Sequence, residues 1–335
     1  HRDLHSFPTR RSSDLERPLN ILATGVGAVI GYGVVRSLRA AGRGWRIIGM
    51  DIYDDAVGRH WCDEFVRARP AAASDYVPFL RELCMSRGID LVIPGIEPDV
   101  QRMSRERAAF GDLPTRWALN DARLIELCAD KWLMHQALAD GASELRIPSF
   151  IDGDFAAVTA RTGLPCLLKP RRGSASKGIC RIDGRDDFDY WRGKLGGDFM
   201  VQPIVGDDAE EYTAASFGYG DGTASAGIVF RRRLGRDGAT RRADVVHEPE
   251  LEAWMVRLTS LLRPVGPTNY QFRRCDGGWK LLEINPRVSS SSSMRTLLGV
   301  NEAAMCVEFY CLGGRPVLTP PAAGRIERYI EDHVC

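Results

Sequence analysis

The segment Thr268–Arg287 restricts the possible folds most strongly, because it predicts a β-hairpin. Its Asp-Gly-Gly sequence is a hairpin turn signal, and strand-like runs lie on both sides of it. If the strands pair symmetrically about Gly277, Gln271 lies directly opposite Glu283. Facing residues have Cβ atoms roughly 5 Å apart, so these two side chains are expected to meet. A bulge in the hairpin would change this register.

Oxygen-bearing side chains gather on one face of this hairpin. Asn285 lies two residues beyond Glu283 in the same strand, so both side chains point to the same face. Together with Gln271 they form a patch of hard oxygen ligands, which suits Mg²⁺. The apolar residues expected to point into the core are Phe272, Leu282 and Ile284. The alternative is a solvated polar strand face.

Basic residues accompany this patch. Arg287 follows the strand, which Pro286 ends, and is expected to bind a phosphate through two parallel hydrogen bonds. Further upstream, an apolar strand delivers Lys169 to a small basic loop, Arg171–Gly178. Backbone N–H groups and cations in such a loop can close over a polyphosphate, although a basic surface hairpin would have a similar sequence.

The N-terminal part of the chain alternates short apolar runs with helical segments, which predicts an α/β domain with a parallel sheet wound with helices. The expected strands are Leu19–Thr24, Trp45–Met50 and Asp90–Pro94, and the expected helices are Ile30–Ala41 and Tyr76–Arg87. The later part is expected to be α+β with antiparallel pairing. Its remaining strands are expected at Leu164–Lys169, Gly178–Ile182, Asp198–Val205, Glu211–Tyr219 and Thr223–Arg232, with helices from Ala122 to about Asp140 and at about Glu250–Leu262.

A glycine cluster, Gly25, Gly27 and Gly31, follows the first strand and opens the first helix. Glycines there let a phosphate approach the helix N-terminus, and Asp51 at the end of the second strand could hold a ribose hydroxyl. However, the spacing is GxGxxxG and departs from the dinucleotide-binding pattern GxGxxG. The alternative is a tight strand–helix turn with close packing.

These segments, in this order, resemble the ATP-grasp superfamily, most of all the carbamoyl-phosphate-synthase large-subunit type. The resemblance covers about residues 16–320. Its most specific part is LLEINPRVSSSSS at Leu281–Ser293, which is similar to the family's E-x-N-P-R-x-S stretch, and Asn269–Phe272 matches an upstream N-x-Q-F. The phosphate loop departs from the family in having few glycines, and Arg231–Arg233 lie where a nucleotide-binding histidine is expected.

The resemblance implies a Rossmann-like pre-ATP-grasp domain followed by an α+β ATP-grasp fold, whose two subdomains clasp a nucleotide. The implied ranges are 16–118 for the first domain, 119–199 and 200–320 for the two subdomains, and 321–335 for a tail. Residues 1–15 are expected to be a non-native extension, because His5–Leu15 reads like a translated sequencing adapter.

The resemblance also implies roles for individual residues. Gln271, Glu283 and Asn285 are the implied metal ligands, and Arg287 and Lys169 the implied catalytic cations. The implied nucleotide-binding residues are Lys131, Lys169, Ser174, Ser176, Lys177, Gly178, Gln202, Ile204, Val205 and Glu211. Within this set, the hinge after Gln202 would recognise adenine and Glu211 the ribose.

Substrate contacts are expected at two further places. Glu97 and Asp99 follow a strand in a segment that resembles a loop facing the active site in relatives. Ser289 and Arg295 follow the metal strand, where hydroxyl groups and a helix N-terminus could bind a carboxylate. The alternative for the serine run is a flexible cap.

The function implied is that of an ATP- and Mg²⁺-dependent ligase, with Mn²⁺ as a substitute metal. It would activate a carboxylate as an acyl phosphate and join it to an amine, releasing ADP and phosphate. Other ATP-grasp chemistry, such as carboxylation or phosphoryl transfer, remains open. So do a NAD(P)-dependent oxidoreductase built on the glycine cluster, and a nucleotide-binding regulator without turnover.

Composition narrows the partners. The net charge of +1 gives no electrostatic case for nucleic acid, and no apolar run approaches the roughly 20 residues of a membrane helix. The odd number of cysteines, 9, without a CxxC sequence favours a reducing, cytoplasmic location over a disulfide framework. Small-molecule substrates are therefore expected, and a homodimer is implied by the resemblance.

Overall fold

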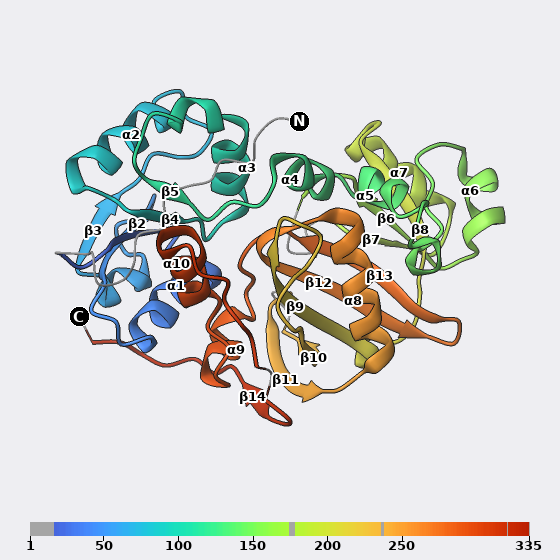
Figure 1. Ribbon diagram of the computed structural model, residues 1–335. Coiled ribbons are helices and arrows are strands. Elements are labelled where there is room, and N and C mark those ends of the chain that lie inside the picture. Colours follow the sequence, from blue (N-terminus) through green and yellow to red (C-terminus); the bar gives the residue numbers. More distant parts are fainter. Residues whose placement is uncertain (1–16, 174–177, 236–237, 320, 335) are drawn as a thin grey trace.

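The computed structural model describes residues 17–173, 178–235, 238–319 and 321–334, which form three sheets (Figure 1). The N-terminal sheet is parallel, with the order β3-β2-β1-β4-β5. Its strands are β1 (Asn20–Thr24), β2 (Arg46–Asp51), β3 (Glu64–Arg67), β4 (Leu91–Ile93) and β5 (Arg116–Trp117). Its helices are α1 (Val29–Ala40), α2 (Tyr76–Arg87) and α3 (Glu97–Arg105), with 3₁₀ turns η2 (Val57–Trp61) and η3 (Arg107–Phe110).

Helices cover both faces of this sheet, which explains its continuous apolar strands. Ile21 packs in one cluster with Val34 of α1, whereas Leu22 packs in another with Leu80 of α2 and Met103 of α3. The three predicted strands and two predicted helices are confirmed to within one residue at each end. Strands β3 and β5 were not predicted, because they are short and only half-buried.

A small antiparallel sheet, β7-β6-β8, forms the first half of the later part. Its elements are β6 (Cys166–Pro170), β7 (Cys180–Ile182) and β8 (Phe199–Pro203), with α6 (Phe155–Thr162) and α7 (Arg185–Leu195). Val158 of α6 and Phe188 of α7 pack with Leu168 and Val201 in one core. The strands were predicted, but α7 was not, because its sequence RDDFDYWRGKL is mostly polar.

The six-stranded sheet has the order β13-β12-β9-β10-β11-β14 and is antiparallel throughout. Its strands are β9 (Glu211–Tyr219), β10 (Ile228–Leu234), β11 (Thr240–Val246), β12 (Val265–Cys275), β13 (Gly278–Asn285) and β14 (Arg325–Glu327). The predicted strand Thr223–Arg232 begins later than expected, at Ile228, and β11 and β14 were not predicted.

The two faces of the six-stranded sheet differ in character. On one face Tyr212, Tyr270 and Phe272 pack with Leu258 of α8 (Pro249–Leu262). On the other face the polar residues of β9, β12 and β13 lie at one end, while Phe217 and its neighbours at the other end pack into the core shared with α1. This second face therefore joins the N-terminal domain to an open cleft.

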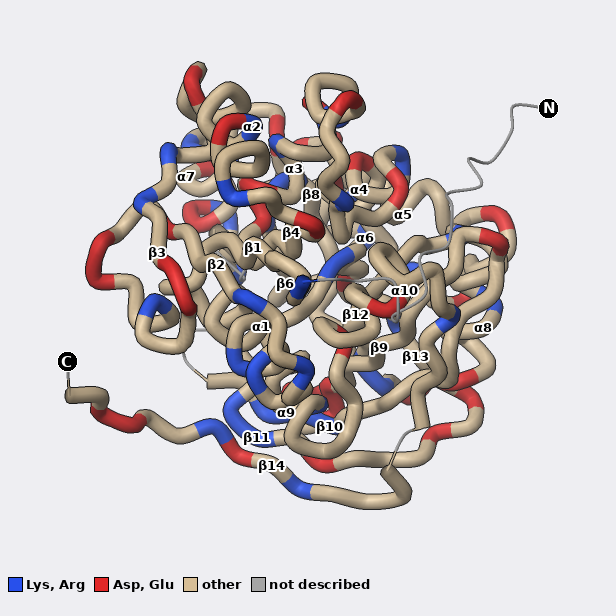
Figure 2. Tube along the Cα trace, turned by 60° about the vertical axis from the view of Figure 1, so that its left-hand side comes forward, with Lys and Arg blue, Asp and Glu red and all other residues tan. Residues whose placement is uncertain are grey.

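Short helices connect these units. Asp121 caps α4 (Ala122–Ala129) and Asp130 caps α5 (Lys131–Ala137), so the helices expected from Ala122 onward are confirmed. The remaining helices are α9 (Ser292–Leu297) and α10 (Glu302–Leu312), with 3₁₀ turns η4 (Ser143–Leu145) and η5 (Asp208–Glu210). Among the described residues no helix is long and apolar enough to cross a membrane. Figure 2 shows acidic and basic residues interspersed over most elements, in keeping with the net charge of +1.

Candidate nucleotide site

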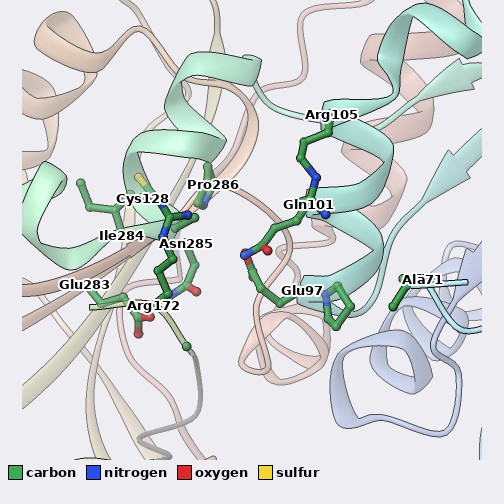
Figure 3. Close-up of a pocket in the computed structure, with 14 residues that line it drawn as sticks. Ala71, Glu97, Gln101, Arg105, Cys128, Arg172, Glu283, Ile284, Asn285 and Pro286 are labelled. Atoms are coloured by element: carbon green, nitrogen blue, oxygen red, sulfur yellow. The ribbon is translucent and has the colours of Figure 1, made fainter. Parts of the chain in front are cut away.

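A cleft of about 1180 Å³ lies between the small sheet and the polar face of the large one. The N-terminal domain contributes to it through Ala28–Ile30 and the segment 95–98. A second cavity of about 320 Å³ adjoins it and shares Glu97, Glu283 and Asn285 with it. In Figure 3, Glu283 and Asn285 lie on one side of this smaller cavity, and Glu97, Gln101 and Arg105 of α3 lie on the other.

The hairpin β12–β13 pairs Gln271 with Glu283 and Asn269 with Asn285, so the predicted facing of Gln271 and Glu283 is confirmed. The route to this register differs from the prediction. The turn pairs Cys275 with Gly278, which is one residue out of step, and a bulge after Gln271 restores the expected pairing.

The same bulge makes the expected burial of Leu282 wrong. Phe272 pairs with Leu281, and both are buried in the core under α8, while Leu282 lines the cleft. Ile284 is buried as predicted. An apolar side chain is therefore available in the cleft to pack against a flat ring.

The end of β13 is joined to the N-terminal domain by an ion pair. Arg287 donates from Nε to Glu97 Oε2 at 2.6 Å and from its NH2 group to Asn285 Oδ1 at 2.9 Å. Arg287 and Asn285 are both buried, and all three residues line the cleft. The guanidinium is thus held in a fixed position at the end of β13.

Two lysines, Lys169 and Lys131, face Glu283 in the cleft. Lys169, at the end of β6, is only 8% exposed, and Lys131 begins α5 and donates from Nζ to Gly173 O at 2.9 Å. Burial lowers the pKa of Lys169 to about 8; the charge of Lys131 adds to this shift, and Glu283 opposes it. Burial likewise lowers the pKa of Lys131. Two amines with reduced pKa values face Glu283 in a site that favours an added anion.

The opposite end of the cleft contains the predicted hinge. Gln202 is buried and donates from Nε2 to Ser149 Oγ at 2.7 Å, and Val205 lines the cleft. Ile204 is exposed and lies outside the cleft lining. Glu211 is buried and accepts hydrogen bonds from Arg232 and Arg273, each at 2.7 Å.

The residues expected to contact the substrate lie in different places relative to the cleft. Ser289 lines the cleft and Glu97 is tied to Arg287, as described above. Asp99 instead points into the N-terminal domain, where its carboxylate accepts from Thr24 Oγ1 and Tyr76 OH and where burial raises its pKa. Helix α3 begins at Glu97, which turns Asp99 toward the sheet and makes its predicted exposure to the cleft wrong.

Arg295 does not reach the cleft either. It is fully buried, pairs with Glu302 at 3.0 Å and donates to Ser289 Oγ at 2.7 Å. It therefore supports Ser289 from beneath instead of contacting a substrate. Of the loop residues predicted to bind phosphate, Ser174, Ser176 and Lys177 lie outside the described residues, and Gly178, with a φ of 77°, lies just before β7.

The first glycine cluster is packed shut. A Cβ on Gly31 would lie 2.2 Å from Gly25 O and 2.4 Å from Thr24 O, so helix α1 packs directly on the end of β1. Asp51, the expected ribose contact, accepts from the backbone N–H groups of Gly27 and Tyr53. These contacts support the alternative of a tight turn and do not support a dinucleotide site.

Two arginines in the cleft were not assigned a role from the sequence. Arg232 and Arg233 of β10 both line it, and Arg232 is only 5% exposed. The alternation of side chains along β10 could have placed Arg232 on the same face as Glu211, but only with the strand order known.

The donor set fits a hard divalent cation. Glu283 offers a carboxylate and Asn285 an amide oxygen, in a cleft with basic groups for substrate phosphates, which is the usual composition of a Mg²⁺ site. Within the described ranges there is no group of three or more His, Cys, Asp or Glu that could hold a metal by itself.

Family models match both parts of the chain. A model described as ATP-grasp in the biosynthetic pathway with Ter operon matches residues 198–328, and a PylC-like N-terminal domain model matches residues 21–117. An uncharacterized protein, y4rH of Sinorhizobium fredii, is 31% identical over 192 residues, covering 51% of this chain. The chain spans only 38% of that relative's length.

Solved structures share the fold. The biotin carboxylase domain of Hydrogenobacter thermophilus 2-oxoglutarate carboxylase, bound to MgADP and bicarbonate, has a TM-score of 0.71 at 15% identity over 90% of this chain and 71% of that chain. N5-carboxyaminoimidazole ribonucleotide synthetase of Thermus thermophilus has 0.67 at 21% identity over 92% and 82%. The Staphylococcus aureus synthetase with ADP has 0.67 at 14% identity over 86% and 78%.

The chain thus has an ATP-grasp fold behind a Rossmann-like N-terminal domain, and the predicted fold class is confirmed. These matches do not confirm the finer likeness to the carbamoyl-phosphate-synthase large subunit. The matches also do not test the roles of individual site residues.

Proposed function

We propose that this protein is an ATP- and Mg²⁺-dependent ligase that forms an amide from a carboxylate and an amine through an acyl phosphate, releasing ADP and phosphate. The observation that carries the proposal is the convergence of Glu283, Asn285, Arg287, Lys131 and Lys169 on one cleft. These residues come from both sheets, α5 and the N-terminal domain junction, so only the folded chain brings them together.

In this proposal the adenine lies near Gln202, Val205 and Leu282, with Glu211 at the ribose. Glu283 and Asn285 hold the metal, which would neutralise and orient the terminal phosphates. Lys169, Lys131 and Arg287 stabilise charge on the transferring phosphoryl group, where positioning and electrostatics supply most of the catalysis.

The carboxylate oxygen attacks the γ-phosphorus in line, and ADP leaves. The amine then attacks the acyl carbon, and phosphate leaves with the oxygen that came from the carboxylate. The cleft around Ser289–Ser291 and Ala28–Ile30 offers room for these substrates beside Arg287. Ser289 is held from below by Arg295, so its hydroxyl is a fixed contact at this end.

The test is a screen of carboxylates and amines, amino acids first, for amine-dependent phosphate release with MgATP. For any active pair, an ¹⁸O-labelled carboxylate must transfer one ¹⁸O to the phosphate, because the acyl phosphate bridges through that oxygen. Phosphate release that requires bicarbonate would instead indicate carboxylation, the reaction class to which the names of several structural neighbours refer. Release with unlabelled phosphate would exclude the acyl phosphate.

A homodimer is proposed as well, since one neighbour is described as a dimer. Light scattering at micromolar concentration measures the mass directly. A mass near 37 kDa would contradict the dimer and leave the proposed ligase reaction unaffected.

A further inference from the structure

The smaller cavity, of about 320 Å³, lies along the edge of the six-stranded sheet and adjoins the nucleotide cleft. Strand β13 stands at the end of the sheet order, and its last residues, with Pro286, line this cavity. The backbone groups on the outer side of an edge strand are not used by a neighbouring strand, so they are available to a ligand. Because Glu283 and Asn285 line both spaces, a molecule in the smaller cavity reaches them from a different side than a nucleotide in the cleft.

Helix α3 forms the opposite wall and presents a graded set of side chains (Figure 3). Glu97, Gln101 and Arg105 are spaced four residues apart, so they lie on one stripe of the helix. Val100 and Met103, on another side of the helix, pack into the N-terminal core. The stripe runs from a carboxylate through an amide to a guanidinium, and its eight-residue span covers about 12 Å of helix axis.

The inner end of this stripe has groups that accept hydrogen bonds. Glu97 Oε2 binds Arg287, and Glu97 Oε1 accepts from Gln101 Nε2 at 3.4 Å. The amide oxygen of Gln101 has no partner among the described residues, so it is free to accept from an N–H group. This end also adjoins Glu283 and Asn285, where the acyl phosphate of the proposed reaction would form.

The other charged groups that line the cavity are cationic. Arg105 is exposed, and its guanidinium makes no ion pair or hydrogen bond within the described part of the chain. On the β13 side, Arg172 lies 3.5 Å from Asp130, while Arg171 makes the shorter contact with that carboxylate, at 2.6 Å. A guanidinium carries five N–H donors, so Arg105 and Arg172 both keep donors for an anion.

The rest of the lining is mostly uncharged. It includes Pro98, Cys128, Ala129 and Ile284. Burial raises the pKa of the Cys128 thiol, so this side chain stays neutral. A short hydrocarbon chain is therefore a suitable body for a ligand whose two ends are polar.

We propose that the smaller cavity is the amine site of the ligase, and that it selects amines with an anionic group several bonds from the reacting nitrogen. The nitrogen lies beside Gln101, and the anionic group lies at Arg105 and Arg172. The neutral amine attacks the acyl carbon, the C–O bond to the phosphate breaks, and the proton lost by the nitrogen leaves on the phosphate. The carboxylate substrate keeps the large cleft beside Arg287. This inference rests on the proposed function and specifies the class of its amine.

The first experiment measures binding by calorimetry to the protein saturated with MgADP. The probes are 6-aminohexanoate and its carboxamide, which differ only in the charge of one end. The carboxylate is expected to bind about tenfold more tightly, because two guanidinium groups gain a charged acceptor. Equal affinities, or no binding of either probe, would overturn the inference. Comparison with 3-aminopropyl phosphate then shows whether the preferred anion is a carboxylate or a phosphate.

A variant of Arg105 tests the source of this preference. Arg105→Met should weaken the binding of 6-aminohexanoate by about fivefold or more and that of the carboxamide by less than about twofold, since only the former is charged. Arg123→Met is the matched control, because Arg123 of α4 is exposed and lines neither cavity; both affinities should stay unchanged. A preference that persists in Arg105→Met would contradict the assignment.

Filling the cavity tests its place independently of charge. Ala72 is exposed in the segment before α2, and it lines the smaller cavity but not the cleft. Ala72→Trp should weaken 6-aminohexanoate binding by about tenfold or more while the affinity for MgADP stays within about twofold. Circular dichroism checks that the variant is folded. An unchanged affinity for the probe in the folded variant would place the amine elsewhere.

The two failures are distinguishable. If the wild-type chain does not bind MgADP, the proposed function fails and this inference fails with it. If it binds MgADP and releases phosphate with a carboxylate and an amine, but shows no preference for the anionic probes, only the inference fails.

Discussion

Two parts of this chain have sequences typical of nucleotide sites, but their polar groups meet different partners. The first, Gly25–Gly31 with Asp51, becomes a close-packed turn whose polar groups bond to each other, although its residues Ala28–Ile30 also line the cleft. The second, around Lys169 and Glu283, lines an open cleft of about 1180 Å³. Glycines therefore indicate close approach of a backbone, but the approaching group can be another part of the chain as well as a phosphate.

The contrast is also one of satisfied and unsatisfied charge. Each oxygen of the Asp51 carboxylate accepts a hydrogen bond from a backbone N–H group of its own domain. In the cleft, buried Lys169 has a pKa lowered to about 8, and Arg232 keeps an unpaired Nε. Buried cationic groups with a lowered pKa or an unused donor are typical of a site that binds an anion.

The largest effect is expected from removal of the metal carboxylate. Glu283→Ala should reduce ATP turnover by about a thousandfold or more, because one carboxylate carries most of the metal's binding. Asp51→Asn is the matched variant in the other region, and it should keep full turnover even if its melting temperature falls. Steady-state phosphate release measures both, and equal losses would break the comparison.

Next in size is a change of stability in the packed turn. Gly31→Ala places a Cβ 2.2 Å from Gly25 O and should cost about 3 kcal/mol, the scale of a core clash. Gly193→Ala in α7 is the control, because among the described residues nothing lies within 4 Å of its added Cβ; it should gain about 0.5–1 kcal/mol. Urea unfolding gives both values. The affinity of folded Gly31→Ala for MgADP should be unchanged.

A smaller effect is expected at the buried lysine. Lys169→Met keeps much of the side-chain volume but removes its charge, and should weaken MgADP binding by about thirtyfold, or roughly 2 kcal/mol. Lys194→Met, on the exposed end of α7 beside Tyr190, should have no effect beyond about twofold. Calorimetry measures the affinity of both variants for MgADP. An unchanged affinity for Lys169→Met would show that Lys169 does not bind the phosphates.

The smallest effect concerns pH. Lys169 has a pKa lowered to about 8, so it is mostly charged below pH 8 and loses its proton as the pH rises through that value. The affinity for MgADP should therefore be highest near pH 7. Above pH 8 it should fall by up to about tenfold for each pH unit. Bound phosphates stabilise the charged form of Lys169, so the fall in affinity begins at a higher pH. In Lys169→Met the decline above pH 8 should be absent, and its persistence would assign it to another group.

Local signals in the sequence predicted much of the fold. Asp-Gly-Gly gave the hairpin, and apolar runs gave the strands of the parallel sheet, because turn chemistry and burial act over a few residues. Elements with polar sequences, such as α7, were missed. Their apolar side chains are few, and Phe188 is the main one that is buried.

The candidate site was predicted in its residues more than in its contacts. Glu283, Asn285, Lys131 and Lys169 lie together in the cleft as the resemblance implied. The places of Asp99 and Arg295 could not be read from the sequence, since they depend on where α3 begins and on the partner Glu302 across a turn.

The sequence by itself determined which segments have alternating side chains, which residues form turns and which carry charge. From these features it followed that Gln271 would face Glu283 in a hairpin. Only the tertiary structure decided what those side chains bind. The order β12-β9-β10 brings Arg232 to the oxygen of Gln271, and the packing of α1 on β1 closes the glycine turn. Strand order and helix packing bring together residues far apart in the chain, and the energies that select them are sums over many such distant contacts.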